Sequence, residues 1–224
     1  MDTGAPTRIY VQYGCGLCAP DGWLNFDASP RLKLERIPGL RFAVHRTVGL
    51  LFPSNVRTGD IVAGLPVADG TAHGVYCSHV LEHLRRDDLP IALRNTYRML
   101  APGGLFRLVV PDLQWRALRY ARAAECGDPG AADALLASCA LGTRTSARTQ
   151  MANLRERSSR NEHLWMYDFA ALKSLLEQTG FDRVRRCAFG DCGDRMFARV
   201  EDRDRFFEAG ERELAVEAAR PAGP

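Results

Sequence analysis

Residues 59–104 read GDIVAGLPVADGTAHGVYCSHVLEHLRRDDLPIALRNTYRMLAPGG, and this stretch decides the fold class. A short apolar run ends at Ser78-His79, a helical pattern continues to Leu100, and Pro102-Gly103-Gly104 stops it. This is the layout of one strand–helix–strand unit. It places the polar segment SHVLEH at the carboxyl end of a strand, which is the edge where open α/β sheets bind ligands.

The rest of the chain continues this alternation of strands and helices. Apolar runs predict seven strands, at residues 8–13, 23–26, 60–63, 75–78, 105–110, 184–189 and 214–219. Helices are predicted over 81–100 and 169–178, the second with Asp168 as N-cap and Gly180 as its stop. Residues 32–57 are ambiguous and predict a helix followed by a loop around Pro53. The pattern indicates an α/β fold with a mostly parallel sheet.

Length and composition indicate one domain that spans residues 1–224. Hydrophobic residues make up 46% of the chain, and no Gly/Ser-rich or Pro-rich linker divides it. The segment after the 105–110 strand is different, because it is rich in Arg and Ala and is broken at Gly127-Asp128-Pro129-Gly130. We therefore predict a helical insertion or lid over residues 113–162.

Charge and cysteine usage exclude several classes of partner. A net charge of +3 is too small to indicate nucleic acid, and no run of apolar residues is long enough for a membrane span. The first residues lack the pattern of a signal peptide, and the seven cysteines form no zinc set, so we expect mostly free thiols and a cytoplasmic protein. Only two lysines accompany the many arginines, which suggests a bacterial source. Nothing in the sequence sets the oligomeric state.

A set of short motifs in a fixed order carries a family resemblance. They read VQYGCG, GWLNFD, GDIVAGLPVADG, VYCSHVLEHL, YRMLAPGGLFRLVVPDL, HLWMYDFAALKSLLEQTGF and LAVEAARP. In this order they resemble class I S-adenosylmethionine-dependent methyltransferases of the type 11 kind. The resemblance implies a Rossmann-like, seven-stranded, mostly parallel sheet with the last strand antiparallel. It covers most of the chain apart from residues 28–56 and the insertion.

The resemblance also implies a set of cofactor-binding residues. Gly14 and Gly16 would let the backbone turn tightly beside the methionine part of the cofactor, and Asp27 would bind the ribose hydroxyls. Asp60 and Ile61 would flank the adenine. Three further residues of the same loop and strand end complete the implied site, namely Tyr13, Cys15 and Ser78.

Each of these assignments has a structural alternative. Gly14 and Gly16 alone fit an ordinary turn at a strand end, Asp27 fits a helix N-cap, and Asp60 fits a turn residue. The chain also departs from the family, because Asp27 follows Gly16 by eleven positions where the dinucleotide-binding fingerprint has about 20. The first crossover helix is therefore expected to be very short or missing. His73 stands where the family has an Asp.

His79, Glu82 and His83 form an H-x-x-E-H motif, whose three side chains would share one face of a helix. One interpretation is a zinc hydrolase. A second is a divalent metal site, because some ubiquinone-pathway O-methyltransferases that the chain resembles hold a cation with E-x-x-E-H at this place. The third is that Glu82 and His83 only pack and cap, and we expect this one, with no metal.

The remaining polar residues near the expected site have two interpretations each. His79 is the first candidate for a general base and His163 the second, the alternative for His163 being a surface or lid residue packed near Trp165. Asp112 would bind substrate or cap a helix. The many arginines between 116 and 160 are interpreted as a solvated helix face, the alternative being an anionic substrate. Cys15 and Cys18 are interpreted as small buried residues rather than a redox pair.

Together these observations predict a methyltransferase that uses S-adenosylmethionine to methylate a small molecule, at oxygen, with base assistance from a histidine. The first alternative is a non-catalytic member of the fold that serves as a partner in a pathway. That alternative predicts that side chains from residues 17–21 fill the cofactor pocket. The second alternative is the zinc hydrolase that uses His79 and His83.

Overall fold

The structure is a computed structural model, which describes residues 8–39, 46, 50–141, 163–207 and 210–223. The strands within these residues are β1 (Ile9–Tyr13), β2 (Leu24–Asp27), β3 (Val56–Thr58), β4 (Ala72–Ser78), β5 (Leu100–Pro111), β6 (Asp182–Arg186) and β7 (Glu213–Ala219). The α-helices are α1 (Pro30–Glu35), α3 (Leu89–Met99), α4 (Leu113–Glu125), α5 (Ala131–Ser138) and α8 (Phe169–Thr179). Short 3-10 helices are η1 (Leu81–His83), η2 (Phe197–Arg199) and η3 (Arg203–Arg205).

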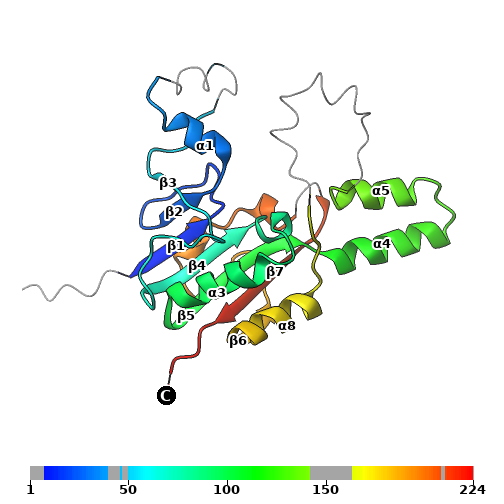
Figure 1. Ribbon diagram of the computed structural model, residues 1–224. Coiled ribbons are helices and arrows are strands. Elements are labelled where there is room, and N and C mark those ends of the chain that lie inside the picture. Colours follow the sequence, from blue (N-terminus) through cyan, green and yellow to red (C-terminus); the bar gives the residue numbers. More distant parts are fainter. Residues whose placement is uncertain (1–7, 40–45, 47–49, 142–162, 208–209, 224) are drawn as a thin grey trace, which may run out of the picture.

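The seven strands of the described residues form one sheet in the order β3-β2-β1-β4-β5-β7-β6 (Figure 1). Neighbouring strands are parallel except at β7, which is antiparallel to both β5 and β6. This topology confirms the predicted Rossmann-like sheet with an antiparallel last strand. The carboxyl ends of β1, β2, β4 and β5 consequently lie along one edge, where such sheets bind ligands.

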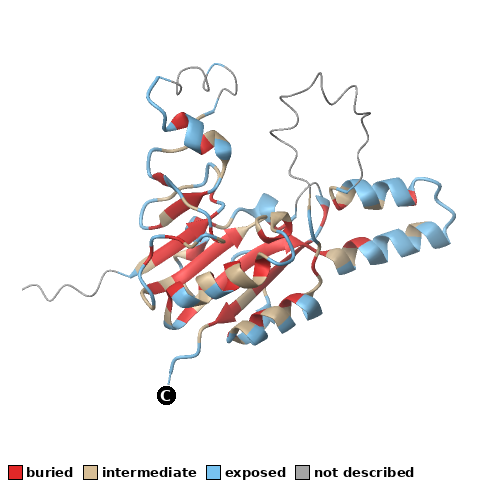
Figure 2. Ribbon diagram, in the orientation of Figure 1, coloured by how far each residue is buried: buried red, intermediate tan, exposed pale blue. Residues whose placement is uncertain are grey.

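Both faces of the sheet are covered by other segments, and Figure 2 shows its central strands coloured as buried. On one face, α3 and α8 bring Leu93 and Leu176 into the main hydrophobic core with Phe106 of β5. On the other face, Trp23 and the segment that contains η2 and η3 form a second cluster with strand residues such as Tyr10. Burial on both faces explains why the predicted strand at 105–110 is apolar at every position except Arg107.

A buried arginine links the sheet to the segment that contains η2 and η3. Arg107 of β5 is 1% exposed and pairs with Glu201 at 2.5 Å, Glu217 at 2.7 Å and Asp191 at 3.0 Å. Burial by itself raises the pKa of Glu217. Hydrogen bonds from Arg107 and Arg185 outweigh this effect, so the pKa of Glu217 is lowered. Arg107 therefore joins the chain between β6 and β7, through Asp191 and Glu201, to strands β5 and β7.

The connection between β1 and β2 contains no helix in residues 14–23, as the short spacing before Asp27 predicted. The loop is held instead by Gln12, whose side-chain amide donates to the Cys18 carbonyl and to Asn25 Oδ1, both at 2.6 Å. Parallel strands usually need a longer crossover. Buried polar contacts of β1 and β2 take its place here.

Several element predictions are wrong in their bounds; the strand predicted at 105–110, for example, is β5 and begins at Leu100. Residues 60–63 are not a strand; they form a turn in which Asp60 Oδ1 accepts from the Val62 amide at 2.8 Å, and the strand is β3, just before it. The helix predicted over 81–100 is split into η1 and α3, because Pro90 sits in the first turn of α3 and favours a helix start there. The strand predicted at 184–189 is β6, which ends at Arg186.

Other local predictions are confirmed. Asp168 caps α8 by accepting from the Ala171 amide at 2.8 Å, and Gly180 ends that helix with φ 108°. Residues 113–138 contain two helices, α4 and α5, joined at the predicted Gly127–Gly130 break and packed side by side away from the sheet (Figure 1). The role of residues 113–162 as an insertion or lid stays a prediction. Residues 142–162 of that segment lie outside the described residues.

Candidate active site

The loop after β1 leaves an open space at the sheet edge. Gly14 and Gly16 have φ values of 66° and 54°, a region that favours glycine, so their prediction as tight-turn residues is confirmed. A Cβ on Gly14 would lie 2.2 Å from Cγ2 of Val80, whereas a Cβ on Gly16 would meet no atom within 4 Å. Gly14 is thus needed for packing, and Gly16 faces free space.

This space is a pocket of about 400 Å³, called here the cofactor pocket, within the size range of ligand sites. Five predicted residues line it, namely Tyr13, Gly14, Cys15, Gly16 and Ser78. Leu17 and Cys18 lie in the lining and leave the pocket open, contrary to what the non-catalytic alternative predicts. Sequence reasoning missed the other lining residues, among them Arg31, Phe52 and Arg205.

Asp27 fixes the loop rather than a helix. Its Oδ2 accepts from the Gly16 amide at 2.9 Å and its Oδ1 from the Ser29 amide at 2.8 Å, and the residue is 8% exposed. The N-cap of α1 is Ser29, so the N-cap alternative for Asp27 is wrong. Each carboxylate oxygen keeps a second lone pair for a ligand, and ribose binding by Asp27 stays a prediction.

Asp60 and Ile61 do not line the cofactor pocket. Asp60 is exposed at the turn described above, which its alternative assignment predicted. Ile61 is 4% exposed and packs in the main core, and its carbonyl accepts from Asn95 Nδ2 at 2.8 Å. Phe52, from a segment that the resemblance did not cover, supplies an apolar ring to the pocket instead.

A second pocket of about 580 Å³, called here the histidine pocket, adjoins the first. It brings together His79, His83 and His163 with charged residues of α4 and of the chain before β7. Arg205 lines both pockets, so the two are neighbours. The pair of pockets can place two ligands next to each other at the carboxyl edge of the sheet.

His79 lies where the two pockets meet. It follows β4 with φ 54°, its amide donates to the Val109 carbonyl at 2.9 Å, and its Nδ1 lies 3.0 Å from Ser78 Oγ. Ser78 lines the cofactor pocket and His79 lines the histidine pocket. One strand end therefore reaches both spaces.

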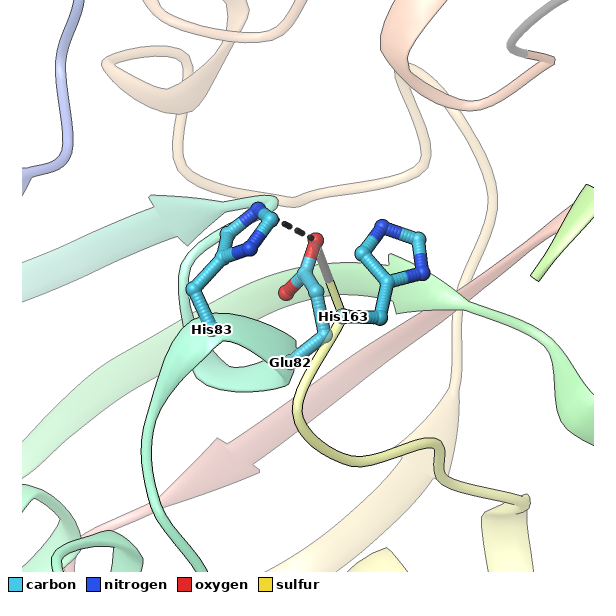
Figure 3. Close-up of side chains that lie close together, drawn as sticks. All are labelled: Glu82, His83 and His163. Atoms are coloured by element: carbon cyan, nitrogen blue, oxygen red, sulfur yellow. Dashed lines mark ion pairs between the residues drawn. The ribbon is translucent and has the colours of Figure 1, made fainter. Parts of the chain in front are cut away.

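The H-x-x-E-H residues do not share a helix face. His79 precedes η1, while Glu82 and His83 lie within it and approach His163 (Figure 3). Glu82 Oε1 is 3.8 Å from His83 Nε2, and the rings of His83 and His163 are 5.3 Å apart between centroids. The residues that lie close together are therefore Glu82, His83 and His163, and not the trio of the H-x-x-E-H motif. The zinc hydrolase interpretation requires His79 beside His83, and His79 is not part of this cluster.

His163 is partly buried rather than a surface residue. Burial and the neighbouring His83 lower the pKa of His163 to about 4. Its ring neighbour is His83 and not Trp165, which is exposed and stacks with Arg86. The lid interpretation near Trp165 is therefore not what the structure shows.

Side-chain contacts hold Asp112 and two of the α4 arginines, Arg116 and Arg119, to the rest of the protein, whereas Arg122 is exposed, as a solvated face predicts. Asp112 accepts from the Trp115 amide at 3.1 Å, which is the capping role, and its substrate-binding role stays a prediction. Arg116 is 5% exposed and pairs with both oxygens of Glu213 at 2.8 and 3.1 Å, so it is not part of a solvated face. Arg119 pairs with Glu211. The arginines from 144 to 160 lie outside the described residues.

The cysteine pair has the chemistry of ordinary thiols. Cys15 is buried, as predicted, whereas Cys18 is exposed, contrary to prediction. Burial raises the pKa of Cys15 to about 12 and also raises the pKa of Cys18. Both thiols are free and poorly ionised at neutral pH, which argues against a redox pair.

A parallel sheet with one antiparallel strand, a glycine loop and two adjoining pockets at the carboxyl edge define the class I methyltransferase fold. A family model described as a methyltransferase domain matches residues 16–185, which is well over half of the chain. The chain therefore belongs to this family of S-adenosylmethionine-dependent methyltransferases. A comparison with curated proteins finds no match. In the described residues, no helix is long and apolar enough to cross a membrane.

Similar solved structures are remote. One is an S-adenosylmethionine-dependent methyltransferase from Archaeoglobus fulgidus, at 17% identity over 95% of this chain and 86% of that one, with a TM-score of 0.49. Another is a possible histamine N-methyltransferase from Thermotoga maritima, at 15% identity over 96% and 84%, with a TM-score of 0.47. A third is the CurJ carbon methyltransferase, at 16% identity over 99% of this chain and 51% of that one, with a TM-score of 0.48. The present chain therefore spans about half the length of that protein.

Proposed function

We propose that the protein transfers a methyl group from S-adenosylmethionine to an oxygen atom of a small molecule bound in the histidine pocket. The observation that carries the proposal is the pair of adjoining pockets, with Ser78 in one and His79 in the other. The cofactor supplies a methyl group activated by a positively charged sulfur. The protein must then hold the acceptor oxygen in line with that methyl group and accept a proton from it.

The lining of the cofactor pocket suits S-adenosylmethionine. Gly16 leaves space beside the loop, Asp27 holds the Gly16 amide, and Phe52 offers an apolar ring. Ser78 lines the same pocket from the end of β4. These residues would bind and orient the cofactor with its reactive end toward the histidine pocket.

His79 is the proposed general base. It is chosen over His163 because β4 places it directly after Ser78, at the boundary of the two pockets. Its Nδ1 lies 3.0 Å from Ser78 Oγ, which orients the ring. A proton on the acceptor hydroxyl would pass to the imidazole as the oxygen attacks the methyl group.

Calorimetry with S-adenosylhomocysteine tests the cofactor half of the proposal. Binding is expected for the full chain, and no heat of binding at millimolar ligand would overturn the assignment as an active methyltransferase. Gly16→Ala is expected to weaken binding, because its methyl group would enter the pocket.

A screen of hydroxyl-bearing acceptors with methyl-labelled cofactor tests the second half. His79→Ala is expected to lower turnover about 10²- to 10⁴-fold while S-adenosylhomocysteine still binds. The matched control is His73→Ala, at the other end of β4, which should leave turnover unchanged. Equal turnover in the His79 and His73 variants would exclude His79 as the base.

A further inference from the structure

We propose that Glu82, His83 and His163 form a binding site for one divalent transition-metal ion of the zinc type. One ligand atom from each residue can be chosen so that the three lie within 4.8 Å of one another (Figure 3). The set joins η1 to a segment that lies eighty residues further along the chain. It differs from the trio that the H-x-x-E-H spacing indicates, because His163 takes the place of His79.

The backbone holds the two ligand segments together without a metal. The Glu82 carbonyl accepts from the amides of Leu164 and Trp165, at 2.7 and 3.1 Å. Further on, the Leu113 amide donates to the Tyr167 carbonyl at 3.0 Å, which fixes the same segment to the end of β5. The position of His163 opposite η1 is therefore built into the fold.

The distances require only side-chain adjustment. Zinc bonds of about 2.0–2.2 Å in a tetrahedral arrangement place ligand atoms roughly 3.3–3.6 Å apart. Glu82 Oε1 and His83 Nε2 are already at 3.8 Å. Rotations that bring the third atom closer by roughly 1 Å would complete the arrangement, since the limit for all pairs is 4.8 Å.

The chemistry of the ligands selects the class of ion. Two imidazoles and one carboxylate suit Zn²⁺, Fe²⁺ or Co²⁺, whereas Mg²⁺ and Ca²⁺ prefer sites made of oxygen ligands. The Glu82 side chain is 0% exposed, and a divalent cation would stabilise a carboxylate at that depth. Nδ1 of His163 is buried and makes no hydrogen bond within the described part of the chain.

The site opens onto the histidine pocket, because both imidazole ligands line it. Three protein ligands leave a coordination position for water or for an oxygen of the acceptor. A metal there would orient that oxygen and lower its pKa. This role rests on the proposed function, whereas metal binding itself does not.

Metal titration of the full chain, after treatment with a chelator, tests the site. Zn²⁺ binding is followed by calorimetry and Co²⁺ binding by its visible absorption, and one equivalent is expected. His163→Ala and His83→Ala should each weaken binding by more than about 100-fold, which exceeds the usual effect of changing a residue that only hydrogen-bonds to a metal ligand. His73→Ala is the control and should bind like the unaltered protein.

Folding is checked by circular dichroism and thermal unfolding for each variant, and Glu82→Gln provides a ligand change that keeps the side-chain shape. The absence of stoichiometric binding at micromolar metal would overturn the proposal. Binding that persists in the His83 and His163 variants would also overturn it, because other residues, for example some of the seven free cysteines, would then hold the ion. Neither result would affect S-adenosylhomocysteine binding, so failure of the metal site and of the proposed function are distinguishable.

Discussion

Replacing Gly14 or Gly16 by alanine distinguishes two roles of the cofactor loop. Gly14 is needed for close packing, and Gly16 leaves room for a ligand. Both Gly14 and Gly16 have positive φ, and an alanine in that region costs about 1–2 kcal/mol. A Cβ on Gly14 also lies 2.2 Å from Cγ2 of Val80, and overpacking of this kind costs about 1–3 kcal/mol more. We therefore expect a loss of about 2–5 kcal/mol for Gly14→Ala and about 1–2 kcal/mol for Gly16→Ala.

Urea unfolding followed by circular dichroism measures these losses. A double-mutant cycle with Val80→Ala isolates the clash, because trimming Val80 should reduce the cost of Gly14→Ala to that of Gly16→Ala. In calorimetry, Gly16→Ala should lose affinity for S-adenosylhomocysteine out of proportion to its loss of stability, since its methyl group points into open space. Equal destabilisation by the two single changes, with no effect of Val80→Ala, would refute the reasoning.

Two other changes test the scaffold. Arg107→Met should destabilise the fold by about 3–5 kcal/mol in urea, because it leaves buried carboxylates without their cation; a change under about 1 kcal/mol would contradict this. The lowered pKa of Glu217 stabilises the fold above the usual glutamate pKa, and this contribution is lost as pH falls through the lowered value, so Arg107→Met should show a shallower acid-side decrease in denaturation profiles. Asp168→Ala should cost about 1 kcal/mol through loss of the α8 cap, whereas Lys173→Ala on the same helix should cost less than about 0.5 kcal/mol in the same assay.

The sequence predicted the elements whose signal is local. The mostly apolar run at 105–110 follows the break Pro102-Gly103-Gly104 and is rich in residues that favour strands, and Asp168 and Gly180 mark both ends of α8. β3 was missed because it has three residues, two of them exposed, and its pairing with β2 depends on tertiary contacts. The apolar spacing from 81 to 100 continues through the turn before α3, so periodicity alone could not locate the break.

The sequence predicted the site residues that lie at the ends of strands. It did not predict how segments distant in the sequence meet there. Gly14 and Gly16 lie in the loop just after β1, Ser78 ends β4 and His79 follows it, and all four line the pockets. No local pattern pairs His163 with Glu82 and His83, because their approach depends on two backbone hydrogen bonds to the Glu82 carbonyl. Phe52 and Arg205 likewise reach the cofactor pocket from segments that carry no motif.

The short segment 78–83 links the parts of the site. Ser78 lines the cofactor pocket, His79 turns the chain with its positive φ, and Val80 packs where only a glycine at 14 leaves room. His83 then faces the histidine pocket. Because these contacts come from consecutive residues, we expect a shift at the cofactor loop to move His79 and His83 with it. Cofactor and acceptor binding are therefore expected to be coupled through this segment, without any larger motion of the sheet.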